Sequence, residues 1–134
     1  MPDSARAPRG LALDLLPGTF AICRLPADAP LPALPPTGAV RSITVTAREI
    51  SIVCPEADAP AGAEVDGGWS ALYLAGPVPF DLAGVLVSVL APLSAASLGV
   101  FALSTFDSDV VLVRSETLDR AMALLSEAGH AVRR

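Results

Sequence analysis

The chain contains the same β-hairpin pattern twice, about sixty residues apart. Residues 42–56 align with residues 102–116, and in each range an alternating strand leads to a tight polar turn, a more apolar strand and a final glutamate. The turns carry an acid, Glu49 in the first and Asp109 in the second. A weak internal repeat of one supersecondary unit predicts two half-domains that cover each other's sheets, and small ligands often bind between such halves.

The composition excludes several classes of function. The 134 residues are 52% hydrophobic and carry a net charge of −5, with nine arginines and no lysine. An acidic chain without a basic cluster is a poor partner for nucleic acid, and the lack of lysine excludes Schiff-base and P-loop chemistry. Cys23 and Cys54 fit neither a zinc site nor a disulfide framework, so we expect buried reduced thiols and a cytoplasmic protein. No metal or cofactor is expected.

One segment is long enough to cross a membrane. Residues 82–106 contain 25 residues without a charge. Pro92 interrupts the segment, serines are scattered through it, and its last third alternates as a strand does, so a buried helix followed by a strand is the favoured interpretation. The N-terminal residues contain no apolar run typical of a signal peptide, so export is not expected.

The N-terminal half is predicted to contain strands and few helices. Residues 1–10 are expected to be disordered, and short apolar runs at 11–16 and 20–25 are typical of strands. Residues 26–38 hold five prolines and therefore predict an extended surface segment. The first hairpin follows, and residues 55–68 are polar and rich in turn residues.

The C-terminal half predicts the order β-α-β-β-α-β. Its expected elements are a strand at Trp69–Ala75, a helix from about Leu82 with Asp81 as N-cap, the hairpin of residues 99–113, a helix capped by Ser115 and ended by Gly129, and a strand at His130–Arg133. Pro92 is expected to kink or shorten the first helix near Ser88. The predicted fold class is α+β, with two tandem ferredoxin-like units, a degenerate helix-poor one at 11–68 and a complete one at 69–134.

This order, with Gly76-Pro-Val-Pro-Phe-Asp-Leu-Ala-Gly-Val-Leu86 at the corner between strand and helix, resembles the ACT domain family. More narrowly, residues 91–93 and 100–116 are similar to the tandem ACT units of CASTOR-like arginine sensors and their small bacterial relatives. The resemblance implies a regulatory module that binds an amino acid where two units meet. It implies these ligand-binding residues: Pro79, Phe80, Asp81, Leu82, Ala83, Gly84, Gly99, Val100, Thr105, Phe106 and Asp109.

Elementary chemistry agrees with this placement. The free N–H groups of a helix that begins near Leu82 suit an α-carboxylate, and Asp109 suits an α-ammonium group. The arginine sensors carry a glutamate where this chain has Leu82, so the resemblance implies a small or aliphatic ligand rather than arginine. Each feature also has a purely structural interpretation: Asp81 as an N-cap, Asp109 as a turn acid, and Trp69 as a core or interface residue.

These observations favour a non-catalytic, amino-acid-binding regulatory or sensor protein that forms a two-fold homodimer. The alternative is a structural dimerisation module with a vestigial pocket. A small ferredoxin-like enzyme is a third possibility, but neither His130 nor any serine has a partner at a readable spacing.

Overall fold

The computed structural model describes residues 10–35, 40–75 and 84–134. The chain forms two compact units, one of residues 17–69 and one of residues 70–134 together with the N-terminal segment up to residue 16. Residues 1–9, for which we predict disorder, lie outside the described residues, as do the predicted site residues Pro79, Phe80, Asp81, Leu82 and Ala83.

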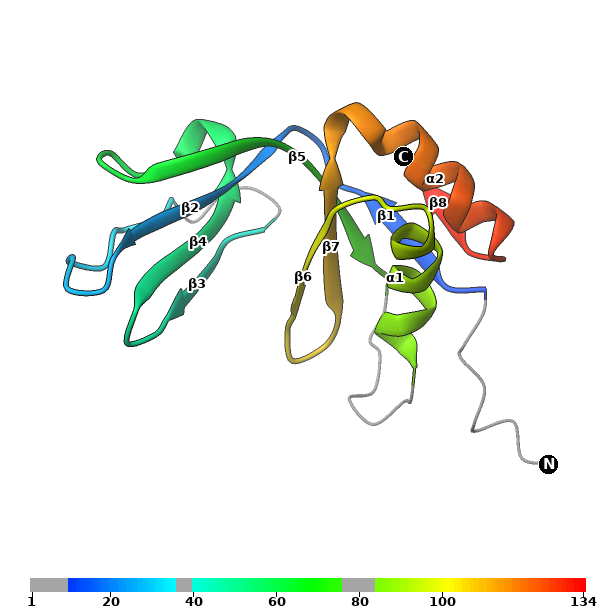
Figure 1. The fold of residues 1–134 in the computed structure, drawn as a ribbon, viewed down its shortest axis with the longest axis horizontal. Coiled ribbons are helices and arrows are strands. Elements are labelled where there is room, and N and C mark those ends of the chain that lie inside the picture. Colours follow the sequence, from blue (N-terminus) through cyan, green and yellow to red (C-terminus); the bar gives the residue numbers. More distant parts are fainter. Residues whose placement is uncertain (1–9, 36–39, 76–83) are drawn as a thin grey trace. The chain divides into compact units, whose positions relative to one another are not determined.

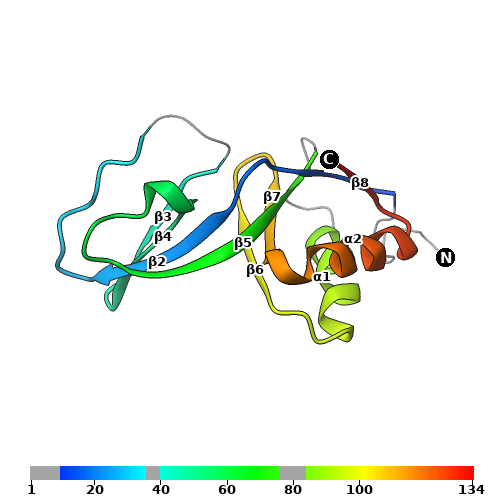
Figure 2. The same cartoon turned by 90° about the horizontal axis from the view of Figure 1, so that it is seen from above.

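The C-terminal unit has the predicted βαββαβ order. Its elements are the end of β5 (Glu64–Leu74), α1 (Val85–Ala95), β6 (Val100–Ser104), β7 (Asp109–Arg114), the 3-10 turn η3 (Ser115–Thr117), α2 (Leu118–Glu127) and β8 (Ala131–Arg133). The two helices lie next to each other beside the sheet (Figures 1 and 2). The predicted α+β, ferredoxin-like class is confirmed.

A strand from the start of the chain completes this sheet. β1 (Ala12–Leu15) is antiparallel to β5, with Leu13 opposite Leu74, and parallel to β8, with Leu13 opposite Val132. The strand order is β8-β1-β5-β7-β6. The predicted boundary between the two units at residues 68 and 69 remains a prediction. The C-terminal sheet also contains β1, which lies outside the predicted range 69–134.

The core of the C-terminal unit lies between the sheet and the two helices. α1 contributes Val85, Val89 and Leu93, which recur every four residues and therefore form one stripe of the helix. α2 contributes Ala121 and Leu125. These side chains pack with Leu13, Leu72, Leu74, Leu98, Val111 and Val113.

The sequence predicts that Pro92 kinks or shortens α1 near Ser88. α1 continues through Pro92 to Ala95, so the helix is not shortened there, and the kink remains a prediction. A proline has no N–H to donate to the carbonyl four residues earlier, which here belongs to Ser88. The His130 ring supplies the missing partner, with its Nε2 2.9 Å from the Ser88 carbonyl oxygen. Because a carbonyl can only accept, Nε2 carries the proton in this contact. The histidine therefore compensates for the proline.

The N-terminal unit is a sheet with little helix. Its strands are β2 (Phe20–Pro26), β3 (Ser42–Val45), β4 (Glu49–Pro55) and the first part of β5, in the order β3-β4-β2-β5. Between Pro17 and Trp69, the described residues contain one 3-10 turn, η2 (Glu56–Asp58), and no α-helix. The prediction of a helix-poor N-terminal half is confirmed.

The proline-rich segment covers the apolar face of the N-terminal sheet. That face carries Ala21, Cys23, Leu25, Ile50, Ile52 and Cys54. Ala29 and Leu34 of the proline-rich segment pack against it, together with Ala59 and Ala63. Extended chain therefore occupies the position that a helix has in a complete ferredoxin-like unit.

The repeat is visible in the hydrogen bonds of the two hairpin turns. In the first turn the Thr46 amide donates to the Glu49 carbonyl (3.0 Å) and the Glu49 amide donates to the Thr46 hydroxyl (3.1 Å). In the second, the same two bonds join Thr105 and Ser108, at 2.7 and 3.1 Å. The equivalent threonines are 59 residues apart, so the sequence alignment is wrong by one residue, and Glu49 corresponds to Ser108 rather than to Asp109.

Two other expectations near β5 are wrong. The strand begins at Glu64, well before Trp69, although its first residues are polar. Ser115 does not cap α2: its hydroxyl lies 2.8 Å from that of Ser70, and α2 begins at Leu118 after a 3-10 turn.

Within the described residues, no helix is long and apolar enough to span a bilayer.

Candidate functional site

The β6–β7 turn gathers three of the predicted ligand-binding residues: Thr105, Phe106 and Asp109. The Thr105 hydroxyl accepts from the Ser108 amide and lies 3.2 Å from the Ser108 carbonyl oxygen, so it braces the turn. Ser108 is buried, and its hydroxyl donates to the Leu74 carbonyl at the end of β5. The turn is therefore fixed against the end of β5, directly before the corner segment.

Asp109 is half-buried at the first position of β7. One of its carboxylate oxygens accepts a hydrogen bond from the Ser104 hydroxyl, across the end of the hairpin. Phe106 is exposed on the turn, with 82% of its surface accessible. A carboxylate and an aromatic ring thus lie at one end of the C-terminal sheet.

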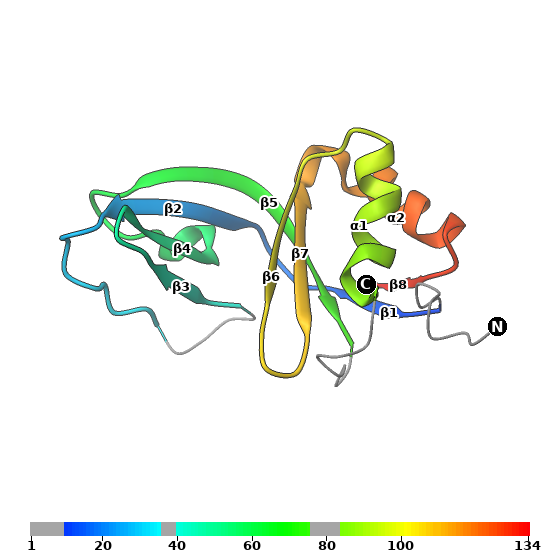
Figure 3. The same cartoon turned by 60° about the horizontal axis from the view of Figure 1, so that its bottom comes forward.

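The start of α1 lies at the same end of this sheet as the β6–β7 turn (Figure 3). Gly84 is the N-cap of α1, and its φ of 77° is a left-handed conformation that favours glycine. Its carbonyl accepts the first helical hydrogen bond from the Ser88 amide, at 2.9 Å. The amides of Val85, Leu86 and Val87 precede that bond and are therefore not used within the helix.

Gly99 and Val100 lie at the other end of β6. Val100 is opposite Val113, whereas Ser104 is opposite Asp109. At about 3.4 Å per residue the two ends of β6 are about 14 Å apart. Within one unit, the start of α1 therefore lies at the same end of the sheet as the turn that carries Thr105, Phe106 and Asp109, whereas Gly99 and Val100 lie at the other end of β6.

Comparison with family models identifies the C-terminal architecture. The ACT domain model matches residues 64–127, from the first residue of β5 to the last residue of α2. Residues 64–127 therefore form an ACT domain. A model that describes the N-terminal domain of a second family matches residues 18–62, which lie within the N-terminal unit. Comparison with curated proteins found no significant match.

Solved structures show the same fold over almost the whole chain. An Agobacterium tumefaciens protein solved by X-ray crystallography is 44% identical, with a TM-score of 0.86 over 94% of this chain and 93% of that one. A Vibrio cholerae protein described as a possible transport protein is 17% identical, with a TM-score of 0.68 over 90% and 91% of the two chains. The regulatory subunit of aspartate kinase from Thermus flavus is 13% identical, with a TM-score of 0.57 over 92% and 99%.

The two cysteines of this ACT protein are buried. Burial raises the pKa of Cys54 to about 11 and also raises the pKa of Cys23, which hydrogen-bonds to Cys54. Neither thiol is in a disulfide. Because both pKa values are raised, both thiols remain protonated and unreactive at neutral pH. Within the described parts of the chain, no three His, Cys, Asp or Glu side chains form a group suited to a metal ion.

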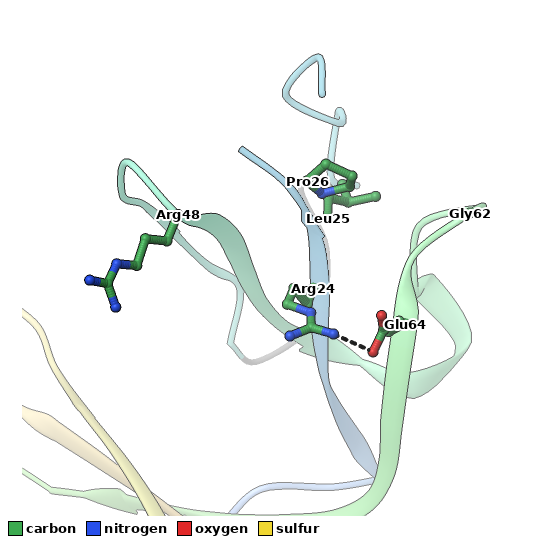
Figure 4. Close-up of a pocket in the computed structure, with 6 residues that line it drawn as sticks. All are labelled: Arg24, Leu25, Pro26, Arg48, Gly62 and Glu64. Carbon is green, nitrogen blue, oxygen red and sulfur yellow. Dashed lines mark ion pairs between the residues drawn. The ribbon is translucent and has the colours of Figure 1, made fainter. Parts of the chain in front are cut away.

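The sequence analysis missed a pocket in the N-terminal unit. Its volume is about 270 Å³, and it is lined by Arg24, Leu25, Pro26, Arg48, Gly62 and Glu64. In Figure 4, Arg24 of β2 and Glu64 of β5 face each other, and Arg48 comes from the β3–β4 turn. The atoms Arg24 Nη2 and Glu64 Oε2 are 2.7 Å apart. The lining residues come from three separate parts of the sequence, so no local motif indicates the pocket.

Proposed function

We propose that this ACT protein is a non-catalytic regulatory or sensor protein that binds an amino acid at the β6–β7 end of its C-terminal unit. The observation that carries the proposal is that the Asp109 turn is bonded to the end of β5 and lies at the same end of the C-terminal sheet as the start of α1. Partners for both charges of a zwitterion are available there. We also propose that the protein acts in the cytoplasm, because its two buried thiols are unpaired.

In the proposed complex, the unused N–H groups at the start of α1 bind the α-carboxylate. Asp109 accepts from the α-ammonium group, for which it must exchange or share its bond with Ser104. Thr105 and Phe106 lie beside this position. Pro79, Phe80, Asp81, Leu82 and Ala83 supply the corner loop in this proposal, and Leu82 favours a small or aliphatic side chain.

The distance of Gly99 and Val100 from the Asp109 turn has a consequence for assembly. If these two residues contact the same ligand, they belong to a facing unit, because one unit holds them about 14 Å from the turn. We therefore propose a two-fold homodimer with two equivalent ligand sites. Binding then stabilises one assembly over another by the difference in ligand affinity.

Calorimetric titration with the free amino acids tests the proposal. The Asp109→Ala variant loses a charge-assisted hydrogen bond, so its affinity should fall at least about tenfold. Asp119→Ala is the matched control, because Asp119 lies in α2 with its side chain 93% exposed. Equal affinities of wild type and Asp109→Ala, with the fold preserved, would rule out this site.

A structural dimerisation module with a vestigial pocket is the alternative. The bonds of Thr105 to Ser108 and of Ser104 to Asp109 favour it, because they use the polar groups of the turn within the hairpin. This alternative predicts a dimer that binds none of the amino acids. Light scattering together with the titration separates the two proposals.

A further inference from the structure

The only two cysteines of the chain are neighbours in the N-terminal unit. β2 and β4 are adjacent antiparallel strands (Figure 1), with Cys23 opposite Ile52 and Cys54 opposite Ala21. Side chains two residues apart on a strand face the same side, so the two thiols are diagonal neighbours on one face of the sheet. Both residues are at most 1% exposed, and the Cys54 thiol hydrogen-bonds to Cys23. Two thiols thus meet in a buried, apolar environment.

This diagonal placement does not suit a disulfide. Diagonal neighbours in an antiparallel pair of strands are about 7–8 Å apart. A disulfide needs a Cα separation below about 7 Å, so closing one between Cys23 and Cys54 requires movement of β2 or β4. An ion between the two sulfur atoms lengthens the bridge and removes this requirement. The geometry therefore favours a bridging ion over a direct bond between the sulfurs.

The surroundings of the two thiols limit which ion can bind. Zinc, calcium and magnesium take at least about four ligands in proteins. In the parts of the chain that the structure describes, no third His, Cys, Asp or Glu side chain joins the pair to form such a group. Water does not readily supply the missing ligands, because this face is covered by Ala29, Leu34, Ala59 and Ala63. A soft ion that accepts two thiolate ligands fits the site, and Cu(I) is such an ion.

A nearby arginine has an unused hydrogen-bond donor. Arg41 Nη2 lies 2.6 Å from Asp58 Oδ2, and this ion pair is close to Cys54. Burial is the main cause of the raised pKa of Cys54, and the nearby charge of Asp58 raises this pKa further, whereas that of Arg41 lowers it. The Nε–H of Arg41 is buried and has no acceptor among the residues that the structure describes. Buried donors nearly always have an acceptor, and a cysteine thiolate, which forms when a metal displaces the thiol proton, is one.

We propose that Cys23 and Cys54 form a two-coordinate site for Cu(I). Binding replaces both S–H bonds by Cu–S bonds and releases two protons, and the copper is neither oxidised nor reduced. Cu(I) cancels one of the two thiolate charges, and the guanidinium of Arg41 acts against the charge that remains. The site lies in a different unit from the Asp109 turn and does not depend on amino-acid binding there.

The segment that covers the thiols provides an entry path for the ion. Residues 27–35 contain no helix or strand, and three of them are prolines, which have no N–H to donate. Segments held by few backbone hydrogen bonds open locally at a low cost in free energy. Cu(I) can therefore reach the thiols while β2 and β4 stay paired.

Anaerobic titration of the reduced full chain tests the site. Cu(I) is supplied as its complex with bicinchoninate, a coloured chelator, so transfer of copper to the protein is measured as loss of colour. We expect one Cu(I) per chain, the release of two protons per ion, and two sulfur ligands in the X-ray absorption spectrum of the bound copper. Zn(II), which needs more ligands than this site offers, should remain with its own chelator.

Variants complete the test. Cys23→Ala and Cys54→Ala should each lower the affinity for Cu(I) more than about a hundredfold, because even the loss of a group that only orients a metal ligand costs about 10–100-fold. Ile52→Val is the matched control: it removes packing from the same face, keeps both thiols and should leave the titration unchanged.

The wild-type measurements decide the question even if a cysteine variant does not fold. The proposal is overturned if bicinchoninate keeps its copper, or if the bound copper has nitrogen or oxygen ligands or more than two sulfur ligands. It is also overturned if folded Cys23→Ala and Cys54→Ala bind Cu(I) as tightly as the wild type does.

Discussion

The contact between His130 and the Ser88 carbonyl predicts a measurable coupling between His130 and Pro92. In the wild-type protein, His130→Ala leaves the Ser88 carbonyl without a donor, because Pro92 has no N–H. An unsatisfied buried acceptor costs about 1–3 kcal/mol, and Ser88 is only half-buried, so the lower part of that range applies. The loss of packing by the buried imidazole adds to this cost in any background.

In a Pro92→Ala background the outcome differs. The alanine introduced by this substitution can donate its amide to the Ser88 carbonyl, so His130→Ala then costs only the packing contribution. The double-mutant cycle should give a coupling of about 1 kcal/mol, above the roughly 0.3–0.5 kcal/mol within which independent mutations usually add. Both described α-helices belong to the C-terminal unit, so urea unfolding followed by helical circular dichroism reports this unit.

A control keeps the cycle specific. Val132→Ala on β8 removes packing from the same core but no hydrogen bond to Ser88, so its cost should be the same in both backgrounds. If His130→Ala costs the same free energy in the wild-type and Pro92→Ala backgrounds, the imidazole does not compensate for the proline and the explanation of the uninterrupted helix is wrong.

Three further predictions concern the glycines, the thiols and the ligand. A Cβ at Gly67 would lie 1.9 Å from Glu56 Oε1, which accepts a hydrogen bond from the Gly68 amide at 2.9 Å. Gly67→Ala should therefore displace the Glu56 carboxylate, break this bond and lower the free energy of unfolding in urea titrations by about 1 kcal/mol. In a Glu56→Ala background the same substitution should cost almost nothing. Burial raises the pKa of Cys54 from 9.0 to about 11, so the stability that its neutral thiol contributes is fully present below pH 9 and is lost, at about 1.4 kcal/mol per pKa unit, as the pH rises toward 11. The urea midpoint of Cys54→Ala should fall less steeply over this pH range than that of the wild type, and the remaining fall comes from Cys23, whose pKa burial also raises. Calorimetry should find that alanine, valine or leucine binds more tightly than arginine, and that Leu82→Glu moves the preference toward arginine; tightest binding of arginine by wild type would refute the inference from Leu82.

Local patterns in the sequence predict the elements of this fold well. The alternation in both hairpins and the apolar recurrence at Val85, Val89 and Leu93 arise from residues close in sequence, and the βαββαβ order follows from them. The one-residue error in the repeat has a physical cause: Glu49 and Asp109 both look like turn acids, but the turns are closed by threonine hydroxyls. Aligning the two threonines, rather than the two acids, gives the correct register.

Contacts between distant segments explain what the sequence does not predict. The uninterrupted α1 depends on a histidine far along the chain, and the N-terminal pocket combines a strand, a turn and the start of β5. No local signal encodes either arrangement. The candidate ligand residues Thr105, Phe106 and Asp109 do gather at one turn, because they are neighbours in sequence. Their role in binding remains a prediction.

The position of β1 sets an order for folding during synthesis. Ala12 is made early, but its partner in β8 is Ala131, near the end of the chain, and Arg133 Nε reaches Asp14 Oδ1 at 2.6 Å. Residues 17–69 contain their hairpin partners locally and can pair as soon as they leave the ribosome. The C-terminal sheet, in contrast, closes only after β8 has been synthesised. Until then the edge of β1 that pairs with β8 stays open, and nascent chains are most vulnerable to wrong strand pairing at that point.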